Sequence, residues 1–291
     1  MMSVSRSSSV PHVAPQSGGV RVVSCELGFD VIEPAEVVLQ LVASETAGQV
    51  LTERLDIGTN GEPPLANIEL RGPHGARVHV VESLAGRLTV SYRSEIAPWE
   101  PATDGTTDPA LDFIRLVYLR PSRYCPSDHL VGFAVAEFGM GSTVRTQVEA
   151  IAEWIRQRIG YVAGSSSVHD SAEDTLLTGM GTCRDFAHLG IALCRAIGVP
   201  ARFASVYAPG LRPMDFHAVF ETFESDRWIA HDATDLAPRQ SLVRIATGRD
   251  AADTAFASVN KGIASFDHLT VSATVAGDLP SDDRRNSVEL A

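Results

Sequence analysis

The pattern of hydrophobic and polar positions changes about a third of the way along the chain. From residue 19 to residue 97, short runs such as VRVVSCELGFDVI, ARVHVVES and RLTVSYRSEI are rich in β-branched residues, and turn-forming stretches such as GTNGEPP separate them. Runs of this kind predict antiparallel strands. We therefore expect residues 19–97 to form a β-rich N-terminal domain, either a sheet or a β-sandwich.

Beyond residues 98–110, a stretch rich in Pro and Thr that we interpret as a linker, the apolar period becomes helical. VRTQVEAIAEWIRQRIGY predicts a helix that ends near Gly160, and a second helical run extends from Cys183 to about residue 197. Three strand candidates follow it, namely ARFASVYA, DFHAVFETF and RWIAHDAT. Helices followed by antiparallel strands predict an α+β domain over residues 111–279.

The two ends of the chain are polar, and the whole chain is acidic. Residues 1–18 are rich in Ser and Pro and lack the apolar run of a secretory signal, so we expect a disordered leader, whereas residues 280–291 predict a polar tail. No run approaches the ~18 apolar residues needed to span a bilayer. The 24 Lys and Arg against 36 Asp and Glu argue against nucleic acid and membrane as partners. We expect a cytoplasmic location.

The four cysteines do not form a disulfide framework. Cys183 and Cys194 lie 11 positions apart on one predicted helix, and a rise of ~16 Å prevents a disulfide between them. Cys183 differs from the others because it stands at the first turn of that helix, where the helix dipole favours a thiolate. The residue is therefore either a small buried side chain or a nucleophile.

The helix itself supplies neither a base nor a metal site for Cys183. His188 lies about 140° around the helix from Cys183, too far to take its proton. A zinc site made by these two residues and Cys194 fails because two of the ligands are three turns apart and the third faces elsewhere. Cys194 is best interpreted as a core residue.

A better pair of residues lies in the strand candidates farther along. If Ser225 and Asp226 form a two-residue hairpin loop, His217 and Asp232 are diagonal neighbours on one face of the hairpin, and His231 points to the other face. A loop one residue longer would invert this conclusion. The alternative is a core histidine beside a solvated aspartate.

Three segments, GMGTCRDFAHLGIALCRAIGVPARFASVY, DFHAVFETF and RWIAHDATD, resemble the transglutaminase-like superfamily in their order and spacing. The resemblance is to its bacterial cysteine-protease-like branch and covers roughly residues 110–275. It implies a papain-like α+β core with Cys183 as the nucleophile, His217 as the base and Asp232 as the group that orients the base. The β-rich N-terminal part also resembles the strand module that precedes this core.

The resemblance implies acyl transfer through a thioester, with a peptide, protein or small amide as substrate and with no cofactor or metal. The backbone N–H of Cys183 would help to hold the oxyanion. Gln147, Trp154 and Tyr161 are candidates for a second donor, and the sequence does not choose among them. Val219 departs from the family, which often carries an aromatic residue there, and no acidic calcium loop is present.

Hydrolysis is the favoured outcome, so a protease or amidase is expected. An enzyme that transfers its acyl group must keep water from the thioester. The stretch YAPGLRPMD at residues 207–215 is a short, rigid rim, and the loop at 162–175 is polar, so neither predicts a dry cover. The alternatives are a transamidase or amide ligase of the same mechanism, or a non-catalytic binding module on the same fold.

Overall fold

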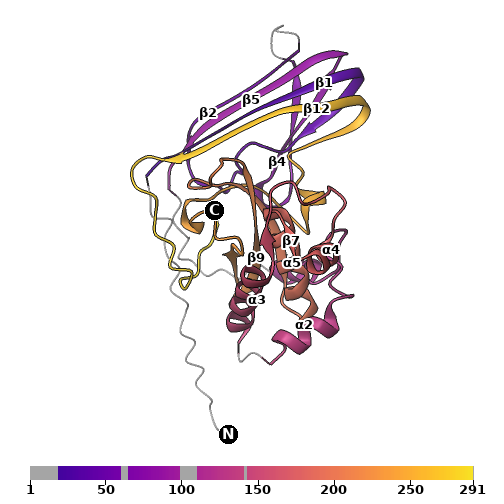
Figure 1. The fold of residues 1–291 in the computed structure, drawn as a ribbon. Helices are drawn as coiled ribbons and strands as arrows, with labels where there is room; N and C mark the ends of the chain where they lie inside the picture. The colour runs from indigo at the N-terminus through magenta and orange to yellow at the C-terminus, as the bar shows by residue number, and fades with distance from the viewer. Residues whose placement is uncertain (1–18, 60–64, 99–109, 141–142, 291) are drawn as a thin grey trace.

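The computed structural model describes residues 19–59, 65–98, 110–140 and 143–290. The predicted leader, 1–18, and residues 99–109 of the predicted linker lie outside the described residues. A long antiparallel sheet forms one layer, and a mixed core of helices and strands lies beneath it (Figure 1). This arrangement confirms the predicted α+β class with a β-rich N-terminal part.

The long layer is a single six-stranded sheet, one of the two forms expected. Its strand order is β2-β5-β1-β4-β3, and β12 pairs with the other edge of β1. Alternate residues of β1, such as Val23, Cys25 and Leu27, are buried on the face that covers the core. Its strands are β1 (Arg21–Leu39), β2 (Val50–Thr59), β3 (Asn67–Arg71), β4 (Arg77–Ser83), β5 (Gly86–Ile96) and β12 (Ala257–Val275).

The strand β12 corrects the predicted domain boundary. Residues 257–275 fall within the domain predicted at 111–279, but they pair with β1 from Leu39↔Ala257 to Arg21↔Val275. Most of β12 is exposed, so its local pattern carries little sign of a partner more than 200 residues away. The N-terminal sheet is therefore completed by a strand from the far end of the chain.

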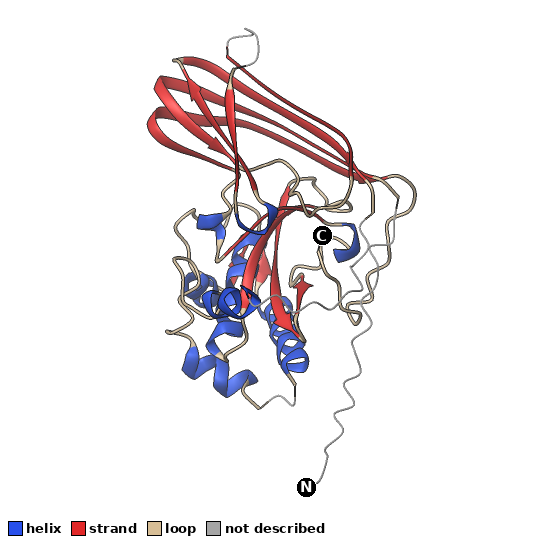
Figure 2. Ribbon diagram, turned by 180° about the vertical axis from the view of Figure 1, so that it is seen from behind, coloured by secondary structure: helices blue, strands red, loops and turns tan. Residues whose placement is uncertain are grey.

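The lower core combines five helices with a four-stranded sheet of order β10-β9-β8-β11 (Figure 2). The helices are α1 (Ala110–Val117), α2 (Val131–Phe138), α3 (Val144–Arg158), α4 (Ala172–Thr178) and α5 (Cys183–Ala196). The strands are β8 (Ala201–Tyr207), β9 (Phe216–Glu224), β10 (Arg227–His231) and β11 (Val243–Gly248), with a short parallel pair, β6 (Gly160–Tyr161) and β7 (Met180–Gly181). The described residues also form 3-10 turns: η1 (Pro73–Gly75), between β3 and β4, and η2 (Arg239–Ser241) and η3 (Ala251–Asp253) on either side of β11.

Close packing fixes α5 against β9, and these two elements carry the cysteine and the histidine of interest. At Gly190 in α5, a Cβ atom would lie 2.6 Å from the Phe220 ring of β9, so only glycine permits this approach. The two layers are also joined, because Tyr207 and Val243 of the smaller sheet share a hydrophobic core with the N-terminal sheet.

The last residues of the chain are packed, which corrects the prediction of a polar tail at 280–291. Val288 and Leu290 are buried, and the Val288 carbonyl accepts a hydrogen bond of 2.8 Å from the Ala230 N–H of β10. Asp282 forms an ion pair of 2.8 Å with the Arg239 guanidinium. Val288 and Leu290 stand among many charged residues, so the composition of this segment predicts exposure to solvent. Both side chains are nevertheless buried in the core.

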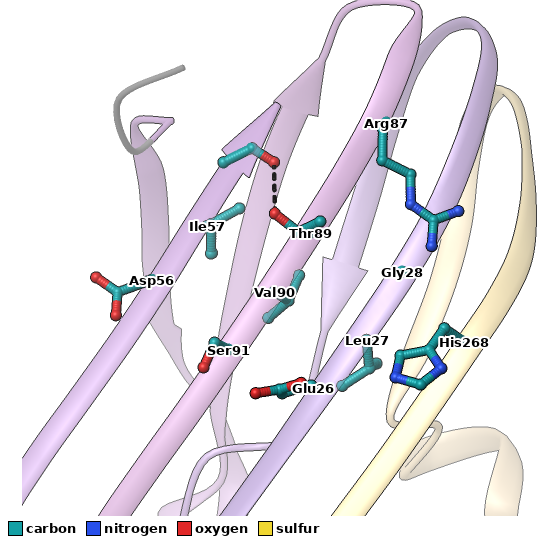
Figure 3. Close-up of a pocket in the computed structure, with 11 residues that line it drawn as sticks. Glu26, Leu27, Gly28, Asp56, Ile57, Arg87, Thr89, Val90, Ser91 and His268 are labelled. Carbon is teal, nitrogen blue, oxygen red and sulfur yellow. Dashed lines mark hydrogen bonds between the residues drawn. The ribbon is translucent and has the colours of Figure 1, made fainter. Parts of the chain in front are cut away.

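A shallow hollow of about 280 Å³ lies on the outer face of the N-terminal sheet (Figure 3). It forms where Gly28 and Gly58 flank Thr89 on neighbouring strands and leave space beside it. Arg87, which lines it, forms an ion pair of 2.9 Å with Asp30. The hollow contains none of the residues that the sequence analysis singled out, so the candidate active site lies elsewhere.

Candidate active site

The start of helix α5 is fixed by the residues on either side of Cys183. The Asp185 carboxylate accepts hydrogen bonds from the Thr182 N–H and from the Thr182 hydroxyl, at 2.7 and 2.8 Å. This Thr-x-x-Asp arrangement caps the helix N-terminus. Burial raises the pKa of Asp185, but these hydrogen bonds, with those from Ser166 and Arg184, lower it overall. Cys183 thus sits, half-buried, on an ordered first turn.

Arg184 ties the preceding loop to the same turn. Its guanidinium lies 2.9 Å from the Asp185 carboxylate and donates a hydrogen bond of 2.7 Å to the Ser166 hydroxyl. It also donates to the Ser167 carbonyl. The polar loop next to Cys183 is therefore held by Arg184, which pairs with the buried Asp185, a role that the sequence alone does not reveal.

His217 is the second residue of β9, and its side chain contacts Asp232, which lies just beyond β10. Its Nε2 atom lies 2.8 Å from the Asp232 carboxylate, and both side chains are almost fully buried. Because a carboxylate only accepts, Nε2 carries the proton in this bond. The geometry holds the imidazole ring in one orientation and one tautomer.

The hairpin register explains why these two residues meet. Arg227 pairs with Glu224, so the loop consists of Ser225 and Asp226, the length on which the prediction depended. Asp232 is oriented in turn by Thr234, whose N–H and hydroxyl donate hydrogen bonds of 2.8 and 2.6 Å to its other oxygen.

The buried pair has shifted titration behaviour. Burial alone would lower the pKa of His217, but the charge and hydrogen bond of Asp232, with a smaller contribution from Cys183, raise it to about 10. Burial would raise the pKa of Asp232, but its contacts with His217 and Thr234 lower it. The arrangement therefore stabilises an imidazolium beside a carboxylate.

The second ring nitrogen of His217 is the one that can exchange a proton with Cys183. Nδ1 is buried and makes no hydrogen bond of standard geometry with any residue that the structure describes. Nε2 is already hydrogen-bonded to Asp232. Because the Cys183 thiol also contributes to the raised pKa of His217, Nδ1 is the ring nitrogen left to interact with it.

The structure separates the three candidates for an oxyanion donor. The Gln147 amide donates to the Phe138 carbonyl at 3.0 Å, and Trp154 packs edge-on against Phe133 and Phe138. Tyr161 lies beside Cys183. Burial is the main reason why the pKa of Tyr161 is raised to about 12. The Cys183 thiol raises this pKa further, and a hydrogen bond with the Cys183 backbone N–H lowers it.

His231 and His188 both have structural partners. His231 Nε2 lies 2.9 Å from the Thr222 hydroxyl and 3.2 Å from Glu224, on the opposite face of the hairpin from His217. His188 is fully buried, and its Nε2 accepts a hydrogen bond of 3.1 Å from the Ala251 N–H. Burial lowers the pKa of His188 to about 3, so this ring stays neutral.

All four cysteines are free, but only Cys183 is partly accessible. Burial raises the pKa of Cys25 to about 11 and that of Cys125 to about 12, and it raises that of Cys194 as well. Within the described ranges, no group of three or more His, Cys, Asp or Glu side chains is placed to hold a metal ion. No helix in those ranges is long and apolar enough to cross a membrane.

Comparison with known proteins gives a consistent result. Residues 135–233, which contain Cys183, His217 and Asp232, match the family model of the transglutaminase-like superfamily. A crystal structure of a candidate cysteine protease from Cytophaga hutchinsonii is 35% identical, with a TM-score of 0.82, over 93% of this chain and 96% of that chain. An uncharacterized protein of Mycobacterium leprae is 29% identical over 205 residues, which cover 64% of this chain and 68% of the relative.

Proposed function

Because the chain belongs to the transglutaminase-like superfamily, we propose that Cys183, His217 and Asp232 form the catalytic triad of an acyl-transfer enzyme that acts on peptide or other amide bonds. The family membership and the similarity to a candidate cysteine protease support a cysteine-dependent enzyme. The observation that carries the proposal is the buried His217–Asp232 pair, whose one unoccupied nitrogen is the atom available to Cys183.

The proposed mechanism follows from the positions of these atoms. His217 Nδ1 takes the thiol proton, and the resulting thiolate is stabilised by the imidazolium and by the N-terminus of α5. The thiolate attacks the amide carbonyl and forms a tetrahedral intermediate. His217 then returns the proton to the leaving amine, and a thioester to Cys183 remains. Asp232 keeps the ring oriented and compensates its positive charge throughout.

Two donors are proposed for the developing oxyanion. The first is the backbone N–H of Cys183, at the helix N-terminus. The second is the Tyr161 hydroxyl, which lies beside the thiol and the backbone N–H of Cys183. Gln147 and Trp154 are engaged elsewhere, by the Phe138 carbonyl and by an aromatic cluster respectively.

Hydrolysis is the proposed fate of the thioester. Arg184 holds the loop before α4 through Ser166, and Val168 in this loop is 67% exposed. A fixed, open rim of this kind does not enclose the thioester in a dry cavity, so water can reach it. A protease or amidase is therefore favoured over a transamidase or amide ligase.

Limiting iodoacetamide at pH 6 should label Cys183 about 100-fold faster than free cysteine, because a free thiol is mostly protonated there. The other three cysteines are buried and should remain nearly unlabelled. Mass spectrometry of the digested protein measures the label at each site. His217→Ala should lower the labelling rate of Cys183 to that of free cysteine, and His231→Ala is the matched control, because His231 faces Thr222 and Glu224 instead. Even labelling of all four cysteines, or slowing by His231→Ala alone, would contradict the triad.

Incubation of the enzyme with a peptide pool and excess primary amine tests the fate of the thioester. We expect predominantly hydrolysed products, because water reaches the open rim around Cys183. Mass spectrometry distinguishes new carboxylates from amine-capped ends, and the Cys183→Ala variant supplies the background. Predominantly amine-capped products would make the protein a transamidase.

A further inference from the structure

Asp215 is a carboxylate on the active-site rim that the triad does not use. It stands immediately before β9 and two residues before His217, so the two side chains emerge on the same face of the strand. Phe216, between them, points to the other face and packs against Tyr207 and Phe256. The strand therefore directs Asp215 towards the side of the sheet where the catalytic histidine lies.

The charge of Asp215 reaches the catalytic groups. The positive charge of His217 lowers the pKa of Asp215, although burial, the largest cause, raises it overall. The charge of Asp215 also helps to raise the pKa of Tyr161, the residue beside the Cys183 backbone. Asp215 thus lies within electrostatic range of both sides of the reacting centre.

Asp215 has no cationic partner in the part of the chain that the structure describes. Its one hydrogen bond is internal, a bond of 2.7 Å from the Phe216 N–H to Oδ1. Other charged side chains around Cys183 are already compensated, since Asp232 pairs with His217 and Asp185 pairs with Arg184. Asp215 is exposed to solvent, so a ligand can approach it, and a carboxylate without a counterion attracts a cationic ligand.

We propose that Asp215 is a specificity-determining residue, which selects acyl donors that carry a positive charge next to the scissile amide. The inference rests on the proposed function, since it concerns the substrate of the same site. A lysine or arginine side chain meets the requirement, with its apolar stem against the exposed side of the Tyr161 ring and its charged group at the carboxylate. Acidic residues at the same place are disfavoured by repulsion.

Thiol reagents that differ in charge test this inference without knowledge of the natural substrate. Trimethylammonium-ethyl methanethiosulfonate is cationic, and sulfonato-ethyl methanethiosulfonate is anionic. We expect Cys183 of the wild-type protein to react faster with the cation, after correction for the rates with free cysteine. Asp215→Asn should lower the cation-to-anion rate ratio about tenfold, because it removes one attraction and one repulsion of roughly threefold each.

The control substitution is Asp226→Asn, which makes the same change of charge in the hairpin loop at the other end of β9. It should leave the rate ratio unchanged, and added salt should reduce the wild-type ratio. An Asp215→Asn protein that keeps the wild-type ratio overturns the inference. The neutral reagent iodoacetamide keeps the two proposals separate. If its reaction with Cys183 does not depend on His217, the triad is contradicted. If that dependence is intact and Asp215→Asn leaves the charge ratio unchanged, only the role of Asp215 is contradicted.

Discussion

Asp232→Asn is expected to lower the rate of Cys183 alkylation at pH 6 by at least about 100-fold, because an unassisted cysteine is less than about 1% thiolate at that pH. The charge of Asp232 is a principal reason why the pKa of His217 lies near 10 instead of 6.5. Without that charge, the buried imidazolium loses its counterion, the proton leaves the ring, and the thiolate loses its own partner.

The pH dependence supplies a second measurement of the same effect. In the wild-type protein, His217 keeps its proton up to about pH 10, so it can act as the acid that protonates the leaving amine throughout the neutral range. In Asp232→Asn, the pKa of His217 falls, and turnover should decline at a correspondingly lower pH. Stopped-flow alkylation measures how the reactivity of the Cys183 thiolate depends on pH, and amide cleavage measures how turnover depends on pH, each from pH 5 to pH 10.

Asp235→Asn is the matched control, because Asp235 lies three residues beyond Asp232, is exposed, and pairs with Arg284 at the surface. Asn is also compatible with its left-handed backbone, at a φ of 59°. We expect wild-type alkylation from this variant. If Asp232→Asn alkylates at the wild-type rate at pH 6, Asp232 does not support His217, and the assignment is wrong.

Local features of the sequence carry much of the information that positions this candidate site. Because side chains alternate along a strand, a two-residue hairpin loop places Asp232 beside His217 and directs His231 to the other face. The helical spacing of apolar residues places Cys183 at the start of α5. The cap formed by Thr182 and Asp185 is also local, and its Thr-x-x-Asp spacing could have been found in the sequence.

Long-range pairing carries the rest, and a single sequence does not reveal it. The strand β12 joins β1 across more than 200 residues, and its exposed face has no pattern that specifies a partner. The burial of Val288 and Leu290 depends on contacts beside β10 that form only in the folded core. The isolation of Asp215 could not be predicted either, because it depends on where every nearby cation is engaged.

Glu221→Gln is expected to lower the free energy of unfolding by roughly 3–5 kcal/mol at pH 7, the range for breaking a buried ion pair by removing one partner. Glu221 is fully buried in β9 between two arginines. Its carboxylate lies 2.7 Å from the Arg202 guanidinium and 2.8 Å from that of Arg244. The neutral amide removes the negative charge that faces both buried guanidinium groups, and urea unfolding followed by circular dichroism measures the loss.

The dependence on pH identifies the charge of Glu221 as the cause. Burial alone would raise the pKa of Glu221, but Arg202 and Arg244 lower it from 4.5 to about 2. A carboxylate with a depressed pKa stabilises the folded state fully above its unfolded-state pKa, and this stabilisation is lost as the pH falls towards the folded-state value. The difference in unfolding free energy between wild type and Glu221→Gln should therefore be constant above about pH 5 and should shrink steadily as the pH falls from 4.5 to about 2.

Glu36→Gln provides the control for this experiment, because Glu36 forms its ion pair with Lys261 at the surface, where the lysine side chain is 72% exposed. Such pairs contribute about 0–1 kcal/mol, so this variant should unfold nearly like the wild type. A Glu221→Gln protein as stable as wild type at pH 7 would show that Arg202 and Arg244 are solvated or paired elsewhere. A large loss that persists undiminished at pH 2 would instead assign the effect to packing, since the wild-type carboxyl is then partly protonated and no longer fully compensates the two arginines.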